Sequence, residues 1–560
     1  MVAGVRRGAW IAIALVFAAA WFATLDVRKL QHPDEGRYAE IAREMVTTGD
    51  WVTPRLNGLK YFEKPALQYW LTAAAFALFG VNEWSARLPP ALGMFAAILA
   101  IGYAGMRIAS PTVGAYGALV LGGMIWPIGI AHIVTLDALL TAFLAAALAA
   151  FLIAQCDVVD IRAERRWMLI AWAAIACGTL VKGPVALAIP AATLVVYSLV
   201  TLDFAVWRRL HLFGGLVVFV ALTAPWFIAV SRANPEFAHF FFVHEHVDRF
   251  LTTEHRRTGA IWYFVPFVIV GLLPWTGAFL WGLPRAWGGS PRGANGFSWQ
   301  RFSIVWMAFV FCFFSLSGSK LSSYILPLFP AAALVVAWQI ERMPQRTLFR
   351  WTIVLAVVAA TILFAVAIAY DGLAARLADE RTPIAIYREF GPWLIAACAV
   401  AAVGDGIAAW AIARDTQARR TLAIATVSLT TLVAVQLAFV GNDAFRMTRS
   451  GADIAAALTN ASPPYDRNAP FYQVEMYDQT LPFYLQRTTT LVAYRDELSL
   501  GLDAEPQKGV ATLADWASRW RDAPQAYALM APDTYARLAK TGLPMRVVAR
   551  DPRRVLVARQ

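Results

Sequence analysis

The sequence predicts a polytopic α-helical membrane protein that ends in a small soluble α/β domain. Of its 560 residues, 59% are hydrophobic and 15% are charged, and the mean hydropathy is +0.54. A typical soluble domain carries about 25% charged residues. Long apolar runs recur as far as Val440 and stop there. We therefore expect a membrane domain over residues 1–440 and a soluble domain over residues 441–560.

The apolar runs supply about 13 predicted transmembrane helices, since a bilayer core of about 30 Å is crossed by roughly 20 residues. They lie at residues 9–25, 88–108, 112–132, 136–155, 167–181, 185–202, 211–231, 260–283, 302–317, 321–340, 350–370, 392–413 and 420–440. The first run follows Arg6 and Arg7 as in a signal peptide, but no small-residue cleavage pattern follows it. We expect it to be retained as the first span.

Arginine clusters give the orientation of the spans, because cytoplasmic loops carry an excess of Lys and Arg. Pairs of spans separate the clusters, so all of them lie on one side: Arg162, Arg165 and Arg166; Arg208 and Arg209; Arg285, Arg292 and Arg301; Arg342, Arg346 and Arg350; Arg414, Arg419 and Arg420. If Arg6 and Arg7 share this side, an even number of crossings separates them from Arg162. The short run at residues 66–79 is then predicted not to cross, but to lie at the interface as a juxtamembrane helix.

With a cytoplasmic N-terminus, several polar segments fall together on the other side of the membrane. They are the first loop (about 26–87), residues 135–137, 182–184, 232–259 and 317–324, and everything after Val440. The net charge of +12 is explained first by this topology, because no basic, aromatic-interleaved soluble domain suggests nucleic-acid binding. The four cysteines lack CxxC spacing, which argues against a disulfide framework and a Cys-based metal site.

After Val440, short β-rich pieces alternate with helical patterns. Residues 470–476 and 489–494 are examples of the former, and residues 511–521 and 533–541 of the latter. This alternation predicts an α/β domain of about 120 residues, within the usual size of a domain. Neither a GxGxxG nor a P-loop motif occurs in the chain.

The first candidate site residues lie in the first loop, between apolar segments where a charge is costly unless it faces water, a partner or a ligand. Asp34 and Glu35 follow Pro33 and precede a helical pattern. An N-cap role for Asp34 therefore competes with proton transfer or the binding of a cationic sugar substituent. For Glu63 and Lys64, a structural ion pair or a snorkelling lysine competes with a phosphate-binding role for Lys64.

A second group of candidates lies in the segment at residues 239–257, which is dense in ionisable groups. Arg249 suits bidentate binding of a phosphate. His244, with Glu63, forms a weak pattern for a divalent metal, and an adventitious metal is favoured over a catalytic one.

Three further candidates stand beside predicted spans. Lys182 and Tyr324 suit interface positions, and Asp137 suits the start of a helix. Taken singly, each of the three residues is explained by its position alone. Together with Lys64 and Arg249 on one face, they indicate an anion site with acidic companions.

The layout resembles that of the GT-C membrane glycosyltransferases, which use polyprenyl-phosphate sugars. Three motifs are similar to those of bacterial 4-amino-4-deoxy-L-arabinose lipid A transferases: residues 32–45 (HPDEGRYAEIAREM), 61–66 (YFEKPA) and 180–184 (LVKGP). The resemblance implies transfer of aminoarabinose from undecaprenyl phosphate to a lipid A phosphate at the periplasmic face of the bacterial inner membrane, which weakens the binding of polymyxin. It also implies that neither a nucleotide sugar nor a metal is required, so that any bound zinc would be adventitious.

The residues and the resemblance together give each candidate a role. We assign Lys64, Arg249, Tyr324 and then Lys182 to the donor phosphate; Glu63, Asp137, Tyr38 and Glu35 to the substrates; and Asp34 to catalysis. Cationic donors would stabilise the charge on the departing phosphate, so a single, inverting displacement follows most simply. The resemblance makes Asp34 the general base, but a phosphate monoester has a second pKa of about 6 and is already largely deprotonated. Orienting the acceptor or holding the sugar's ammonium group is therefore an open alternative for Asp34.

Two other functions remain open at this point. A protein O-mannosyltransferase, or another polyprenyl-phosphate-dependent glycosyltransferase, would keep the fold and change the acceptor. A transporter of lipid-linked sugars is less favoured, because we expect no charged residue in the middle of a span and detect no inverted repeat.

Overall fold

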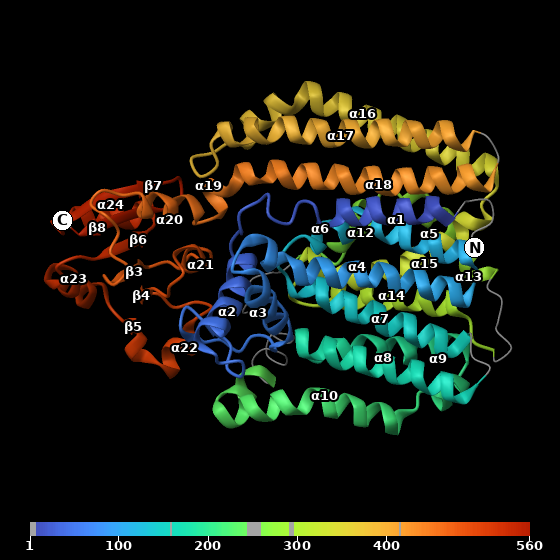
Figure 1. Cartoon of the computed structure of the whole chain (residues 1–560), viewed down its shortest axis with the longest axis horizontal. Coiled ribbons are helices and arrows are strands. Elements are labelled where there is room, and N and C mark those ends of the chain that lie inside the picture. Colours follow the sequence, from blue (N-terminus) through green and yellow to red (C-terminus); the bar gives the residue numbers. More distant parts are fainter. Residues whose placement is uncertain (1–6, 157–159, 243–258, 290–295, 414–415, 560) are drawn as a thin grey trace.

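A computed structural model describes residues 7–156, 160–242, 259–289, 296–413 and 416–559. A long bundle of helices carries a smaller mixed domain at one end, and the first loop of the chain lies between the two (Figure 1). The first helix begins at the end of the bundle away from that domain (Figure 1).

The helices of the bundle are apolar over most of their length. They are α1 (Arg7–Phe22), α4 (Glu83–Ile108), α5 (Pro111–Gly122), α6 (Ile125–Ala131), α7 (Leu136–Cys156), α8 (Ile161–Lys182), α9 (Val185–Thr201), η1 (Ala205–Arg209), α10 (Leu212–Ala233), α12 (Phe264–Gly271), α13 (Thr276–Gly288), α14 (Trp299–Leu316), η3 (Ser322–Leu328), α15 (Phe329–Arg342), α16 (Gln345–Leu377), α17 (Ile384–Ile412) and α18 (Gln417–Asn442).

The length and composition of these helices make the chain a multi-pass membrane protein, as predicted. Within the described residues, eight helices could cross a membrane, or up to ten if each bent pair is one span. The bent pairs are α5 with α6, at 62°, and α12 with α13, at 104°. The count of about 13 spans stays a prediction, because α1 and α9 are apolar but shorter than 18 residues.

One carboxyl group lies inside a span, contrary to expectation. Asp405 of α17 is buried, with 7% of its surface exposed, and it lines a cavity of about 320 Å³ between α16, α17 and α18. The run around Asp405 is so apolar that a single acid does not interrupt it. The argument that no charge lies mid-span is therefore wrong at this position.

The first loop folds into two helices and a hairpin at one end of the bundle. The helices α2 (Asp34–Thr48) and α3 (Leu67–Phe79) flank the antiparallel strands β1 (Arg55–Leu56) and β2 (Leu59–Lys60). Asn57 and Gly58 turn the hairpin with φ values of 56° and 77°, as a two-residue Asn-Gly turn favours.

Helix α3 is the run that we predict to lie at the interface. Its 13 residues extend about 20 Å at 1.5 Å per residue, which is short of a membrane crossing. It packs against α2 and α4, between the bundle and the C-terminal domain (Figure 1). Both its length and its place agree with the prediction.

The C-terminal domain is a mixed sheet with helices on both faces, which confirms the predicted α/β class. Its elements are η4 (Asp443–Phe445), α19 (Arg446–Arg449), α20 (Ala452–Thr459), β3 (Phe471–Val474), α21 (Leu481–Leu485), β4 (Thr490–Val492), α22 (Ser499–Ala504), η5 (Pro506–Lys508), β5 (Gly509–Val510), α23 (Leu513–Asp522), β6 (Tyr527–Met530), α24 (Pro532–Ala539), β7 (Met545–Arg550) and β8 (Val555–Arg559). The strand order is β5-β4-β3-β6-β8-β7, in which the first four strands are parallel and the last two are joined by antiparallel pairing.

Alternate residues of the strands feed two separate cores. Tyr472 of β3 packs with Trp516 and Trp520 of α23 on one face, while its neighbour Phe471 packs with Leu458 of α20 on the other. This alternation follows from the two-residue period of a strand. Both faces of the sheet are thus covered. The domain boundary at residue 441 stays a prediction.

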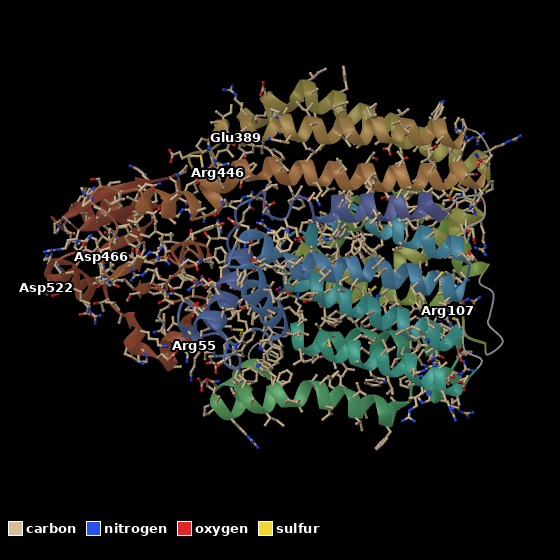
Figure 2. The ribbon with its side chains drawn as sticks, in the orientation of Figure 1. Arg55, Arg107, Glu389, Arg446, Asp466 and Asp522 are labelled. Carbon is tan, nitrogen blue, oxygen red and sulfur yellow. The ribbon has the colours of Figure 1, made fainter. Side chains whose placement is uncertain are left out.

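The C-terminal domain contacts the bundle largely through the first loop. The Asn57 side chain donates a hydrogen bond to the Thr489 carbonyl at 2.8 Å, and Arg55 forms an ion pair with Glu505 at 3.0 Å. Arg55 lies at this interface in Figure 2, whereas Arg107 lies near the opposite end of the bundle. The loop that carries the first candidate residues is therefore held from both sides.

Candidate active site

Asp34 is the first residue of α2, and its carboxylate is open to water. Pro33 occupies the N-cap position without a side-chain hydrogen bond, so the alternative of Asp34 as the N-cap is not what the structure has. Acidic residues in the first turn interact favourably with the positive end of the helix dipole. The Arg37 guanidinium donates to Asp34 Oδ1 at 2.8 Å, and 43% of the Asp34 side chain is exposed. Asp34 is thus oriented by one arginine and accessible to a ligand.

Glu35, the next residue, is a buried ionic hub. Its side chain is 2% exposed and accepts two hydrogen bonds each from Arg28, at 3.0 and 3.1 Å, and from Arg87, at 2.8 and 3.1 Å. Burial alone would raise the pKa of this carboxyl, but Arg28 and Arg87 lower it to about 2. Since its oxygens are already occupied, the geometry favours a structural role over the predicted contact with substrate.

Tyr38 of α2 packs against α3. It is buried, and its ring centroid lies 6.0 Å from that of Tyr69 of α3. Burial raises the pKa of its hydroxyl well above the usual range, and the negative charges of Asp34 and Glu63 raise it further. Asp34 and Glu63 therefore act on the same buried phenol.

Lys64 lies three residues before the start of α3. Its ammonium group donates to the backbone carbonyl of Glu63 at 2.6 Å. Because α3 lies at the end of the bundle that faces the C-terminal domain (Figure 1), Lys64 lies at that end as well. Its predicted contact with the donor phosphate is compatible with this position.

Asp137, Lys182 and Tyr324 form one cluster, although three separate segments carry them. Lys182, the last residue of α8, forms an ion pair with Asp137 Oδ1 in the first turn of α7. The Lys182 ammonium lies 4.3 Å from the ring centroid of Tyr324 in η3. Ser323 donates a hydrogen bond to Asp137 Oδ2 at 2.7 Å, a partner that sequence reasoning missed. The structure therefore brings together three residues that the sequence proposed singly.

A backbone contact connects this cluster with the first loop. The Val134 amide donates to Glu35 Oε1 at 3.3 Å, and Asp137 follows Val134 by three residues. Arg28 also donates to the His132 carbonyl at 3.2 Å. The Glu35 hub thus holds the start of α7 against the first loop.

Two predicted residues, Arg249 and His244, lie outside the described residues. Among the residues that are described, no group of three or more His, Cys, Asp or Glu side chains is placed to hold a metal. The metal hypothesis with Glu63 therefore stays a prediction.

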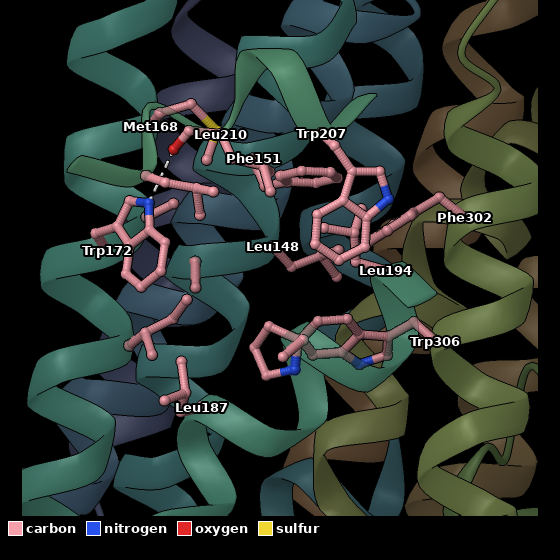
Figure 3. A pocket seen from close by; sticks show the side chains of 16 residues that line it. Leu148, Phe151, Met168, Trp172, Leu187, Leu194, Trp207, Leu210, Phe302 and Trp306 are labelled. Atoms are coloured by element: carbon pink, nitrogen blue, oxygen red, sulfur yellow. Dashed lines mark hydrogen bonds between the residues drawn. The ribbon is translucent and has the colours of Figure 1, made fainter. Parts of the chain in front are cut away.

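An apolar cavity lies in the bundle apart from these charged groups. It has a volume of about 130 Å³ and is lined by residues of α7, α8, α9 and α14, including Phe151, Trp172 and Trp306 (Figure 3). Its first lining residue on α7, Ala147, is ten residues past Asp137, or about 15 Å along the helix. This lining has no charged group that could bind a phosphate, so the cavity itself does not suit the predicted phosphate site.

The protein is a membrane glycosyltransferase of the GT-C class. Its helical bundle carries ionic groups at one end, on the same side as the C-terminal domain. The comparisons with known proteins agree. The family described as dolichyl-phosphate-mannose-protein mannosyltransferase matches residues 9–241, and the aminoarabinose transferase C-terminal domain matches residues 458–559. The chain belongs to the family of the undecaprenyl phosphate-aminoarabinose arabinosyl transferases.

Individual relatives carry this assignment. The crystal structure of ArnT from Cupriavidus metallidurans bound to undecaprenyl phosphate is 38% identical, with a TM-score of 0.91 over 99% of this chain and 98% of that one. The undecaprenyl phosphate-alpha-4-amino-4-deoxy-L-arabinose arabinosyl transferase of Erwinia tasmaniensis is 33% identical over 332 residues, and the match spans 58% of each chain. An oligosaccharyltransferase from Archaeoglobus fulgidus, 11% identical with a TM-score of 0.50 over 94% of this chain and 68% of that one, shares the fold alone.

Proposed function

We propose that the protein transfers 4-amino-4-deoxy-L-arabinose from undecaprenyl phosphate to a phosphate of lipid A. The observation that carries this proposal is the likeness over nearly the whole chain to an ArnT bound to undecaprenyl phosphate. The charged groups of the first loop and of the Asp137 cluster support a site for anionic and cationic substrate groups. The positive-inside pattern supports a site and a C-terminal domain in the periplasm, with the bundle in the inner membrane.

The proposed reaction needs cationic groups that stabilise the departing phosphate. A lipid A phosphate oxygen attacks the anomeric carbon of the sugar. The bond from that carbon to the donor phosphate oxygen breaks, and undecaprenyl phosphate leaves with the bonding electron pair. Lys64, Arg249 and Tyr324, with Lys182, stabilise the charge on the leaving phosphate. A single displacement inverts the anomeric centre, and neither a nucleotide sugar nor a metal takes part.

Asp34 orients a substrate group in this proposal. Because a phosphate monoester is largely ionised near neutral pH, the reaction needs orientation of the acceptor or of the sugar's ammonium group more than removal of a proton. The exposed carboxylate of Asp34, held by Arg37, suits this task. Glu63 and Asp137 are the alternatives for the ammonium group, although Asp137 already pairs with Lys182.

Lipid A from cells with and without the gene tests the proposal. In a host that lacks its own transferase but makes the donor lipid, we expect expression of this chain to add aminoarabinose to lipid A, read by mass spectrometry, and to raise resistance to polymyxin. The added amine lowers the negative charge that attracts the cationic peptide. Unmodified lipid A despite a normal level of the protein in the membrane would contradict the proposal.

A second candidate is transfer of a polyprenyl-phosphate sugar to protein. The match of residues 9–241 to the mannosyltransferase family favours this alternative. Glycosylated protein alongside unchanged lipid A in the same cells would select it.

A further inference from the structure

Helix α2 lies unusually close to the C-terminal domain at its first turn. A Cβ atom on Gly36 would lie 2.6 Å from Thr480 Cγ2 and 2.7 Å from the carbonyl carbon and oxygen of Gln479. Real Cβ contacts are essentially never this short, so only glycine permits the approach. The backbone at Gln479 is thereby pressed against the helix that carries Asp34.

Beside Gly36, Arg37 links Asp34 to the C-terminal domain. One terminal nitrogen of its guanidinium donates to Asp34 at 2.8 Å, and the other forms an ion pair with Glu497. The second Glu497 oxygen accepts a hydrogen bond from the Gln479 side chain at 2.5 Å. The links therefore run from Gln479 through Glu497 and Arg37 to Asp34.

Exposure differs along these links. The Arg37 and Glu497 side chains are 11% and 10% exposed, whereas 43% of the Asp34 side chain is exposed. A buried guanidinium is stable only with a carboxylate partner, and its planar fork fixes the direction of both partners. The buried pair thus acts as a fixed support, and Asp34 is the end that a ligand can reach.

We propose that Glu497 is a positioning residue for sugar transfer, which holds Arg37 so that Arg37 in turn fixes the carboxylate of Asp34. The C-terminal domain then completes the site instead of only covering it. This inference rests on the proposed function for its catalytic readout, and it gives the C-terminal domain a part in the reaction.

A matched ion pair in the same interface provides the control. Glu505 of the C-terminal domain pairs with Arg55 of the first loop at 3.0 Å, and its side chain is 13% exposed. Glu505 has the same kind of partner as Glu497 and a similar burial, but it pairs with the hairpin and not with α2. A role limited to docking of the domain predicts the same effect from both glutamates.

The test measures kcat and KM of the purified full-length protein for Glu497→Ala, Glu497→Asp and Glu505→Ala. We expect Glu497→Ala to lower kcat about tenfold or more, with KM for the donor within about twofold, because a small misplacement of a reacting group has large effects on rate. Glu497→Asp keeps the charge and should recover part of the loss. Glu505→Ala should leave kcat within about twofold. Equal effects of the two alanine variants on kcat would overturn the inference.

A structural readout separates this inference from the proposed function. A cryo-EM structure of Glu497→Ala should show the Arg37 guanidinium turned away from its present position and the Asp34 carboxylate moved with it. Unchanged positions of both side chains would overturn the inference whatever sugar the protein transfers. Failure of the wild type to transfer aminoarabinose would instead count against the proposed function alone.

Discussion

Asp137 and Lys182 form an ion pair across 45 residues of sequence, at the point where α7 begins and α8 ends. Ser323 and the ring of Tyr324 complete the surroundings of the pair. The ammonium of Lys182 is therefore held in place by the fold itself. Such an arrangement suits stabilisation of charge that develops during a reaction, because it needs no rearrangement at that moment.

Loss of either partner of this pair should impair transfer. We expect Lys182→Met and Asp137→Asn each to lower kcat/KM about tenfold or more, and the double variant to lower it less than the product of the two. Contacting charges couple in this way, by about 0.5–3 kcal/mol. Steady-state kinetics of the three variants give the coupling energy. The control is Lys29→Met, which removes a lysine that is 44% exposed and paired with Glu83, and its kcat/KM should stay within about twofold of the wild-type value. Independent effects of Lys182→Met and Asp137→Asn would contradict the prediction.

Asp34→Asn should abolish polymyxin resistance while the amount of protein in the membrane stays unchanged. The side chain is 43% exposed and pairs with one arginine, so its charge adds little to stability. Complementation, lipid A mass spectrometry and an immunoblot measure the three quantities. Full activity of the variant would remove Asp34 from the site.

Glu35→Gln should destabilise the protein, because it leaves Arg28 and Arg87 without their buried carboxylate. We expect a loss of about 3–5 kcal/mol in the free energy of unfolding, as for the breaking of a buried ion pair. Glu83→Gln is the control, with an expected loss of at most about 1 kcal/mol, because its partner Lys29 is 44% exposed. Thermal unfolding in detergent at pH 7 measures both, and equal melting temperatures would show that Glu35 is not the hub.

The contribution of Glu35 to the stability of the folded protein should also depend on pH. Its pKa falls from an ordinary 4.5 to about 2 in the folded protein, because Arg28 and Arg87 outweigh the opposing effect of burial. A lowered pKa stabilises the folded state above pH 4.5, and the stabilisation is lost as the pH falls towards 2. We expect the difference in melting temperature between wild type and Glu35→Gln to be full at pH 6 and smaller at pH 3. A difference that grows on acidification would contradict this assignment.

Gly36→Ala should loosen the C-terminal domain from the membrane domain. The added methyl group would meet the backbone of Gln479 within 2.7 Å, and overpacking of this kind costs about 1–3 kcal/mol. Limited proteolysis should release the C-terminal domain faster in this variant than in the wild type. Gly372→Ala in α16 is the matched control, since no atom lies within 4 Å of its added Cβ; equal rates of release from both variants would refute the prediction.

The sequence could predict which charged residues stand between apolar segments, but not which residues they pair with in the folded protein. The Arg clusters and the lengths of the runs led to a multi-pass bundle with an interfacial α3, because these depend on local composition. The Asp137, Lys182 and Tyr324 cluster was expected only as a shared face, since contact across 45 residues depends on packing. Glu35 shows the limit clearly: adjacent to Asp34 in sequence, it points in another direction and is buried between two arginines.

The Arg28 and Arg87 partners of Glu35 were missed for the same reason. Arg87 stands in the first turns of α4, where an interface position explains it equally well from sequence. Its side chain instead bonds to the Leu25 and Arg28 carbonyls as well as to Glu35. Only the folded loop brings these acceptors together. The sequence therefore shows only that a charged residue stands in an apolar region, where its burial is energetically unfavourable. It does not show the partners that compensate for this burial.

The contacts of the C-terminal domain bear on how parts of related enzymes can be exchanged. Asn57, Arg55 and Arg37 of the first loop each bond to a residue of that domain. A chimera that replaces only the C-terminal domain keeps the Arg55 and Arg37 pairings only if the new domain carries a carboxylate at the positions of Glu505 and Glu497. The natural unit of exchange between relatives is therefore the first loop together with the C-terminal domain, two pieces that lie far apart in the sequence.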